Sequence, residues 1–410
     1  MAKYIMCGID LHDESLLTKT ACDRKRPETR SFRNTPSGRR RLIEHLRDEA
    51  RRCSAKEIWA AYEASAQGYG LHDELEEAGI RCEVLAPTKL QHTPKSRRLK
   101  TDEKDAERVL EALRGHLLAG NALPACWVPD QETRDDRELV RARLDAGGEI
   151  SALKAALRTL LKRNKLDKPE EAGEAWSRPY RAWLIELAAE SSPLGPGARA
   201  RLGSLLRRLQ AMEQEIAILD EQVRGLSRSE RHRQACARLC SLKGVGVLTA
   251  MVFLTEMGRM GRFQNRRQVA AYMGVAPSSH ETGEGAERKG HITRQGSPRL
   301  RKVLCQAAWA RVRSDRAEGR WYKRVVDNGN AKKRKKLALV GVMRRLAILM
   351  WHEASAETPP LPSPQRGEAP ASASGPAPLK REAGAGAPGL SRDARGPYRG
   401  QGSRPAPRRL

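Results

Sequence analysis

The sequence lacks the features of a membrane or secreted protein. Its most apolar run, residues 245–254, is far shorter than the roughly 20 residues that a membrane-spanning helix needs. The opening MAKYIMCGID has no basic segment followed by an apolar core, so we expect no secretory signal. Eight cysteines are scattered, and the one close pair, Cys236 and Cys240, has no second pair or histidine cluster to complete a zinc site. We therefore expect a cytoplasmic protein without a membrane span, whose cysteines are reduced and mostly buried.

The sequence has far fewer acidic than basic residues. The 410 residues contain 77 Lys and Arg against 50 Asp and Glu, a formal net charge of +27, which indicates a polyanionic partner. The excess is uneven, because residues 1–130 carry 23 basic and 21 acidic side chains whereas 284–345 carry 19 and 5. The basic segment includes KKRKK at 332–336 and is interleaved with Trp309, Trp321 and Tyr322. A basic run is often only a solvated face, but one with interleaved aromatic residues favours contact with nucleic acid.

The hydrophobic pattern changes along the chain. Over 1–130 we expect strands at 3–9, 15–21, 58–62, 80–85 and 126–128, and helices at 35–52, 69–78 and 101–116. Strands separated by helices predict an α/β domain with a partly parallel sheet. Residues 236–352 predict a second, mostly helical unit. In 353–410 the density of Pro, Gly, Ala and Arg predicts a disordered tail whose arginines add weak affinity for nucleic acid.

Residues 131–235 have a helical pattern throughout. Apolar residues recur there with heptad spacing, at positions 202, 205, 209, 212, 216, 219, 223 and 226. Two structures fit this repeat: a helical hairpin formed within one chain with residues 151–161, or a coiled coil between two copies of the chain. In either case we expect a spacer or an assembly element, not a reaction site.

Four carboxylates are positioned to bind metal ions. Asp10 ends the first expected strand in CGIDLH, and Glu63 ends the third in WAAYEAS. Asp102 and Asp105 stand three residues apart at a helix start in LKTDEKDAERV, so both project from one face. Singly, such residues are usually turn or cap residues. Together they supply hard oxygen ligands from separate elements at one sheet edge, the ribonuclease-H-like way to bind two Mg²⁺ ions, or Mn²⁺, for phosphoryl transfer.

Several further residues are candidates for contact with nucleic acid. Basic residues just before the aspartate pair lie where a phosphate backbone would enter. The string LKGVG at 242–246 resembles a helix-hairpin-helix turn, whose glycines let backbone amides approach a phosphate; an ordinary helix connection is the alternative. The candidates are Arg97, Arg98 and Lys100 in the first set, Gly244 and Gly246 in the turn, and Lys289, Arg294 and Arg301 in the late basic segment.

GIDLH, YEAS and KTDEKDAERV together resemble the three motifs of the DEDD transposases of bacterial insertion sequences, the Piv-like family numbered one hundred and ten. The resemblance covers about residues 3–165 and 236–325 and not the tail. It implies a RuvC-like domain whose four metal ligands are Asp10, Glu63, Asp102 and Asp105, and all four are intact.

A second region, from Tyr272 to Trp309, is similar to the family's other conserved segment. The matching residues are Gly274, Pro277, Gly283, Gly290, Ile292, Thr293, Gly296, Leu300 and Arg301. In the family, the serine of a Ser-Gly pair is the nucleophile that joins covalently to a DNA end, and here that position is Thr282. Three alternatives follow: the Thr282 hydroxyl attacks, more slowly because its methyl group crowds the approach; Ser278 or Ser279 replaces it after a loop shift; or this copy is impaired.

The expected protein is a transposase or recombinase that cleaves DNA, attaches to it through a hydroxyl and exchanges strands. Its expected parts are a RuvC-like domain (1–130, with the family match to about 165), a coiled-coil spacer (131–235), a C-terminal transposase domain (236–352) and a tail (353–410). The resemblance further implies an element-encoded bridge RNA that selects target and donor sites. Since each domain holds half of the chemistry, we expect a homo-oligomer, a dimer or tetramer, associated with the nucleoid. The rivals are a hydrolytic Holliday-junction-type resolvase and a catalytically impaired nucleic-acid-binding relic.

Overall fold

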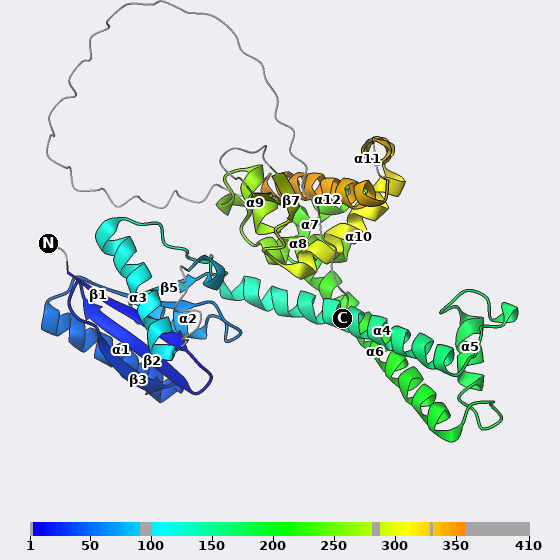
Figure 1. Ribbon diagram of the computed structural model, residues 1–410, viewed down its shortest axis with the longest axis horizontal. Coiled ribbons are helices and arrows are strands. Elements are labelled where there is room, and N and C mark those ends of the chain that lie inside the picture. Colours follow the sequence, from blue (N-terminus) through cyan, green and yellow to red (C-terminus); the bar gives the residue numbers. More distant parts are fainter. Residues whose placement is uncertain (1–2, 91–100, 281–287, 329–330, 357–410) are drawn as a thin grey trace, which may run out of the picture. The chain divides into compact units, whose positions relative to one another are not determined.

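A computed structural model gives the fold of the chain (Figure 1). It describes residues 3–90, 101–280, 288–328 and 331–356, through the backbone alone at 279–280, 288–289 and 331–333. Several predicted features lie outside the described residues: the basic loop with Arg97, Arg98 and Lys100, the position of Thr282, and nearly all of the tail. Within the described ranges, every helix is too short or too polar to cross a membrane.

A five-stranded sheet forms the centre of the N-terminal domain. Its strands are β1 (Tyr4–Leu11), β2 (Ser15–Cys22), β3 (Glu28–Arg33), β4 (Glu57–Glu63) and β5 (Arg81–Leu85). They lie in the order β3-β2-β1-β4-β5. The first three are antiparallel neighbours, whereas β1, β4 and β5 are parallel. The expectation of an α/β domain with a partly parallel sheet is confirmed.

Two strand predictions for this domain were wrong. The segment expected as a strand at 126–128 is irregular, and only an isolated antiparallel bridge between Ala125 and Leu85 lies beside it. Conversely, β3 was not predicted. Its sequence ETRSFR has exposed side chains at five of six positions, with only Phe32 partly buried, because β3 is an edge strand that needs no apolar face.

Helices cover both faces of the sheet. The helices are α1 (Pro36–Cys53), α2 (Gly70–Glu77) and α3 (Asp102–Ala119), with a short 3₁₀ turn, η1 (Pro87–Lys89). Leu42 of α1 and Leu75 of α2 share a core with Ile5 and Ile9 of β1. Met6, which points to the opposite face of β1, packs against α3. The sheet is therefore the middle layer of three.

Two 33-residue helices, α4 (Gln131–Arg163) and α6 (Pro196–Arg228), form an antiparallel hairpin, visible in Figure 1. The segment between them contains η2 (Glu170–Ala172) and α5 (Arg178–Glu186). Leu202, Leu205 and Leu209 of the heptad pattern are buried with Leu153 and Leu157 of α4. The heptad pattern predicted either a hairpin within one chain or a coiled coil between two copies, and the structure contains the hairpin.

The remaining residues are mostly helical, as expected. The elements are α7 (Arg233–Cys240), α8 (Val247–Met257), η3 (Met260–Arg262), α9 (Arg266–Tyr272), α10 (Pro298–Ser314), α11 (Arg316–Asp327) and α12 (Ala331–Ser355), with a two-stranded sheet of β6 (Pro277–His280) and β7 (Arg288–Ile292). The apolar helix α8 lies at the centre of this core. Val140 and Leu144 of α4 and Val223 of α6 belong to the same core, so the base of the hairpin is part of this unit.

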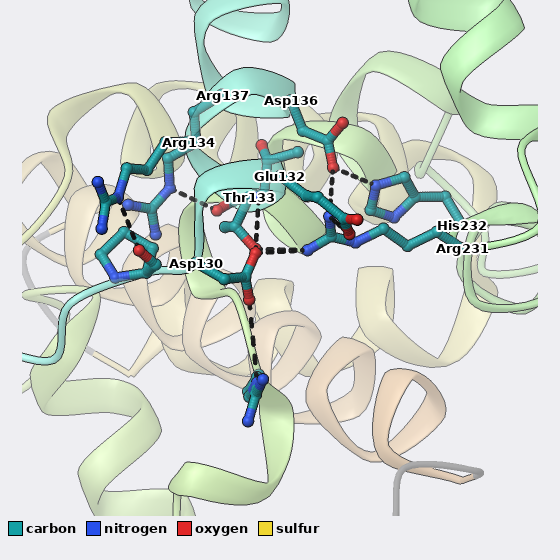
Figure 2. A network of polar contacts seen from close by, with 11 residues as sticks. Asp130, Glu132, Thr133, Arg134, Asp136, Arg137, Arg231 and His232 are labelled. Atoms are coloured by element: carbon teal, nitrogen blue, oxygen red, sulfur yellow. Dashed lines mark hydrogen bonds and ion pairs between the residues drawn. The ribbon is translucent and has the colours of Figure 1, made fainter. Parts of the chain in front are cut away.

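A polar network fastens the start of α4 to the junction of α6 and α7 (Figure 2). Arg231 donates to Asp130 at 3.0 Å and to Glu132 at 2.7 Å. The Nε2 atom of His232 lies 2.8 Å from a carboxylate oxygen of Asp136. These contacts join residues about 100 positions apart in the sequence.

Asp130 is also the N-cap of α4 and accepts a hydrogen bond from the backbone amide of Thr133. Burial alone would raise the pKa of Asp130. The hydrogen bonds from Thr133 and from Arg231 outweigh burial and lower the pKa to about 2. Asp130 is therefore a charged carboxylate that holds both the helix start and the junction.

Candidate active site

The ends of two parallel strands bring the first two candidate carboxylates to one edge of the sheet. Ile9 of β1 is paired with Tyr62 of β4, and Asp10 and Glu63 are the next residues on these strands. Because parallel strands end at the same edge, Asp10 and Glu63 both belong to that edge. Strand β1 carries alternate residues to opposite faces, so Asp10 leaves β1 on the side of Gly8 and Met6.

Gly8 allows α3 to lie directly against β1. A Cβ atom at Gly8 would be 2.2 Å from the carbonyl oxygen of Ala106 and 2.5 Å from the backbone nitrogen of Leu110. Only a residue without a side chain permits such a contact between a strand and a helix backbone. Since α3 starts at Asp102, this contact brings Asp102 and Asp105 to β1, close to the end of the strand where Asp10 lies.

His12 joins two of the candidate carboxylates. Its Nε2 atom lies 2.9 Å from Oδ2 of Asp10 and 3.6 Å from Oδ1 of Asp102. The three side chains have ligand atoms within 4.8 Å of one another. Burial raises the pKa of Asp10, the nearby imidazole of His12 opposes this shift, and the charges of Asp105 and Asp102 add to it. His12 belongs to the GIDLH string but was not predicted as a site residue.

Arg108 joins the other two carboxylates. Its Nη2 atom donates to Glu63 at 2.9 Å and to Asp105 at 2.6 Å, and Asp105 is only 7% exposed. Arg108 stands one turn beyond Asp105 on α3, so an i,i+3 ion pair forms within the helix. The sequence analysis missed this residue too. The four carboxylates thus form two neighbouring pairs, one bridged by His12 and one by Arg108.

The donor set fits a hard divalent cation. Carboxylate oxygens from β1, β4 and α3 are the ligands that Mg²⁺ prefers. Burial is the main cause of the raised pKa of Asp10, the charges of Asp105 and Asp102 add to it, and a cation beside these groups would favour their charged forms. Among the described residues, Asp10, His12 and Asp102 are one of two groups with this spacing. The other group, Glu28, His45 and Glu49, lies at the start of β3 and on α1, not at the carboxyl ends of β1 and β4.

The LKGVG segment is a tight turn between α7 and α8. Gly244 has a φ of +90°, and a Cβ atom there would be 2.6 Å from the carbonyl oxygen of Ala307. Gly244 is therefore required both by the turn and by its packing on α10. Gly246 is the N-cap of α8, and its Cβ position is open. Gly246 and Val247 at this helix start are both exposed, and contact with a phosphate there stays a prediction.

Two glycines and an arginine hold the base of the β6–β7 hairpin. Gly274 and Gly296 have positive φ values and lie in backbone-to-backbone contact with the opposite side of the hairpin base. Arg301 donates to the carbonyl oxygens of Met273, at 3.2 Å, and of Gly296, at 2.9 Å. Part of the guanidinium of Arg301 is therefore used to brace the hairpin, in addition to the predicted contact with nucleic acid.

The hairpin brackets the position of the predicted nucleophile. Ser279 and Lys289 are paired across β6 and β7, and the chain between these strands includes Thr282, outside the described residues. The side chain of Ser278 is half-buried, that of Arg294 is exposed, and those of Ser279 and Lys289 are not described. The two strands therefore fix where the loop with position 282 begins and ends.

Two family models match the chain. One, described as "Transposase", is the model of IS110-type DEDD transposases and matches residues 7–164. The other, described as "Transposase IS116/IS110/IS902 family", matches residues 236–324. The first match begins within β1 and covers the rest of the sheet, its helices and all of α4, including every candidate carboxylate. The second extends from α7 to α11 and includes the hairpin.

Individual proteins are similar over longer stretches. The protein y4qE of Sinorhizobium fredii is 29% identical over 255 residues, which are 62% of this chain and 58% of y4qE. The transposase for insertion sequence element IS1533 of Leptospira borgpetersenii is 24% identical over 75% of this chain and 86% of its own length. The transposase for IS1111A of Coxiella burnetii is 24% identical over 67% and 71%.

Proposed function

Because the chain belongs to the IS110/IS116 family of transposases by both of its matched regions, we propose that it cleaves and joins DNA strands to mobilise an insertion sequence. The observation that carries the proposal is the meeting of β1, β4 and α3 at one sheet edge, where Asp10, Glu63, Asp102 and Asp105 gather. In this reading the N-terminal domain is ribonuclease-H-like, of the RuvC type, and the sheet order β3-β2-β1-β4-β5 supports it.

The four carboxylates would hold Mg²⁺, two ions in the family's manner, with Mn²⁺ as a substitute. Bound there, the ions would supply Lewis-acid activation of a DNA phosphate. The chain's own residues fix the ligands: Gly8 sets the distance between strand and helix, and His12 orients Asp10 through a hydrogen bond. Arg108 holds Glu63 and Asp105 in place and keeps a positive charge beside them.

The covalent half of the reaction would use a hydroxyl in the β6–β7 hairpin. The oxygen of Thr282, or of Ser278 or Ser279, would attack the phosphorus and form a new P–O bond. The bond from phosphorus to the DNA's own oxygen breaks, and that oxygen leaves as a hydroxyl after it takes up the proton. Rejoining reverses these steps with a different DNA end, so no outside oxidant or energy source is needed.

The proposed partners are DNA and a bridge RNA encoded by the element, in the nucleoid. Arg97, Arg98, Lys100, Lys289, Arg294 and Arg301, with the turn at Gly244 and Gly246, are the proposed contacts to nucleic-acid backbone. A homo-oligomer, a dimer or tetramer, would complete each active site with a metal half and a hydroxyl half. The proposed domains are those predicted above, at 1–130, 131–235, 236–352 and 353–410.

A cleavage assay tests the proposed metal site. The purified chain is incubated with a labelled junction that contains the element's ends, with Mg²⁺ or with EDTA. We expect cleavage only with Mg²⁺, and a loss of at least about 100-fold in Asp10→Asn. The matched control is Asp167→Asn, an exposed aspartate between α4 and η2, which should cleave like the parent. If Asp10→Asn and Asp102→Asn leave excision unchanged in cells, the metal-site proposal is wrong and a binding relic is favoured.

The same assay tests the hydroxyl half. A denaturing gel should show a covalent protein–DNA adduct with the parent, and none with Thr282→Ala when Thr282 is the nucleophile. An adduct that persists there but disappears when Ser278 and Ser279 are also replaced would assign it to one of the serines. Clean nicking that survives all three replacements, without any adduct, would favour the hydrolytic resolvase.

A further inference from the structure

Helix α10 presents one outward stripe of polar and aromatic residues. Lys302, Gln306, Trp309 and Arg313 are all exposed, at the spacing i, i+4, i+7 and i+11 that keeps side chains on one helix face. The opposite face is buried and includes Leu300, Val303, Leu304, Ala307 and Ala308. The stripe is therefore the solvent face of a helix whose other side is fixed in the core.

Trp309 is held in place although one side of its ring is open. It is 38% exposed and is the one aromatic residue among the large exposed apolar side chains of the described chain. Tyr322 of α11 packs against it edge-on, with ring centroids 5.7 Å apart and planes at 61°. An open hollow of about 490 Å³ lies beside the ring and is lined by Gln306, Trp309 and Arg313. A fixed, open indole beside a hollow is a surface on which a flat ring can stack.

The cations around Trp309 are available to a ligand. Neither Lys302 nor Arg313 has an ion pair or a hydrogen-bond partner within the part of the chain that the structure describes, and the same holds for four basic residues of α11, Arg316, Arg320, Lys323 and Arg324. Residues 298–328 carry nine basic and three acidic side chains. Of the acidic ones, Glu318 is buried and Asp315 caps α11. The surface is thus an aromatic platform inside a field of unpaired positive charge.

We propose that this surface binds an unpaired nucleotide: the base stacks on Trp309, the amide of Gln306 contacts the base edge, and Lys302 and Arg313 pair with phosphates on either side. Lys302 and Arg313 are eleven residues apart, about 16 Å along the helix axis, so the two cations flank the ring. Stacking on a side chain needs a base free of its own stack, which favours single strands over duplex. The proposal rests on the proposed function only in that the partner is nucleic acid.

A second copy of the chain fits this surface less well. An isologous contact through α10 and α11 would bring unpaired cations against the same cations of the other copy, and like charges in an interface are unfavourable. Nucleic acid supplies both the flat ring and the negative charge that the surface lacks. The single-stranded source, DNA or RNA, is left to the experiment.

Binding is measured with the full chain in EDTA, which prevents cleavage, by fluorescence anisotropy of a labelled 20-nucleotide DNA, its RNA equivalent and the DNA duplex. Trp309→Ala should weaken single-strand binding by roughly 5- to 100-fold and change duplex binding by less than about twofold. Trp309→Phe, which keeps a ring, should restore most of it. Ile218→Ala, which removes an exposed apolar side chain on α6, is the control and should bind like the parent.

The charged residues give a second measurement that does not depend on the packing of Trp309. Lys302→Gln with Arg313→Gln should lower the slope of log affinity against log salt by about 1.4 for single strands. The DNA and RNA arms identify which strand the platform prefers. The proposal is overturned if Trp309→Ala binds both single strands like the parent, or if it weakens duplex equally. Because no arm needs metal or cleavage, a failure here is distinct from a failure of the proposed active site.

Discussion

The contact between Gly8 and α3 makes a sharp prediction for the variant Gly8→Ala. The added methyl group would lie 2.2 Å from the carbonyl oxygen of Ala106, whereas ordinary contact begins at 3.4 Å, so strand and helix must separate by about 1.2 Å. The clashing atoms are backbone, and no side chain can rotate away. Overpacking of this kind typically costs about 1–3 kcal/mol of stability. Because α3 carries Asp102 and Asp105, the same shift moves two of the four carboxylates away from Asp10.

The cleavage rate of Gly8→Ala should therefore fall even at temperatures where the variant is fully folded. A misplacement of about 1 Å at a reacting centre can cost on the order of 100-fold in rate. Thermal unfolding followed by circular dichroism gives the stability, and Mg²⁺-dependent cleavage is then measured at a temperature where the variant is fully folded. The expected result is a folded protein whose cleavage is reduced about 100-fold.

The control for this experiment is Gly70→Ala. Gly70 begins α2 in the same domain, and a Cβ atom there meets nothing within 4 Å. This variant should match the parent in both measurements. If Gly8→Ala also cleaves within about twofold of the parent, the contact between β1 and α3 does not position the site, and our account of the sheet edge is refuted.

Three other variants test separate parts of the structure by unfolding measurements. Arg108→Gln should lower the free energy of unfolding by about 2 kcal/mol in EDTA, because Glu63 and Asp105 lose the guanidinium that pairs with them. Mg²⁺ should then stabilise this variant more than it stabilises the parent. Equal stabilisation of both proteins by Mg²⁺ would contradict this prediction. Asp130→Asn should lose about 1 kcal/mol at pH 6, a value reduced because Asp130 is 37% exposed. The folded pKa is depressed, so the difference from the parent should shrink as the pH falls from about 4 toward 2, and a constant difference would exclude this charge as the cause. Leu157→Ala should cost about 2–5 kcal/mol at the hairpin interface, whereas Ile218→Ala, at a 55% exposed site, should cost little; similar losses would argue against the hairpin core.

The regular core of the N-terminal domain could be predicted because its patterning is simple. Strand β4 and its neighbours β1 and β5 carry apolar residues that are buried in the sheet, and Thr35 followed by Pro36 marks the start of α1 clearly. Strand β3 escaped prediction since an exposed edge strand is stabilised by backbone pairing with β2, which leaves no hydrophobic signature. The segment at 126–128 has the composition of a strand, but the described chain meets the edge strand β5 in one bridge, between Ala125 and Leu85, and does not continue it as a ladder.

The sequence also predicted only part of the candidate site. That the four carboxylates lie near one sheet edge could be predicted, because strand ends and an i,i+3 pair at a helix start are visible in the sequence; their role as metal ligands stays a prediction. His12 and Arg108 could not be predicted, because their importance comes from where they point. His12 stands two residues after Asp10, just past the end of β1, and Arg108 lies one turn after Asp105. Both spacings are visible in the sequence, but they gain meaning only once β1, β4 and α3 are placed together.

The net charge of +27 counts two kinds of basic residue, those already paired with a carboxylate and those without such a partner, and the sequence alone does not distinguish them. Three form two-point contacts with carboxylates on other helices: Arg141 with Glu256, Arg143 with Asp220, and Arg181 with Glu213. Such residues hold the helical unit together and already have their counter-charge, so they release few ions when nucleic acid binds. Residues such as Lys302 and Arg313 have no such partner within the described chain. The salt dependence of binding should therefore follow the number of unpaired cations on α10 and α11, and it should be shallower than the total charge suggests.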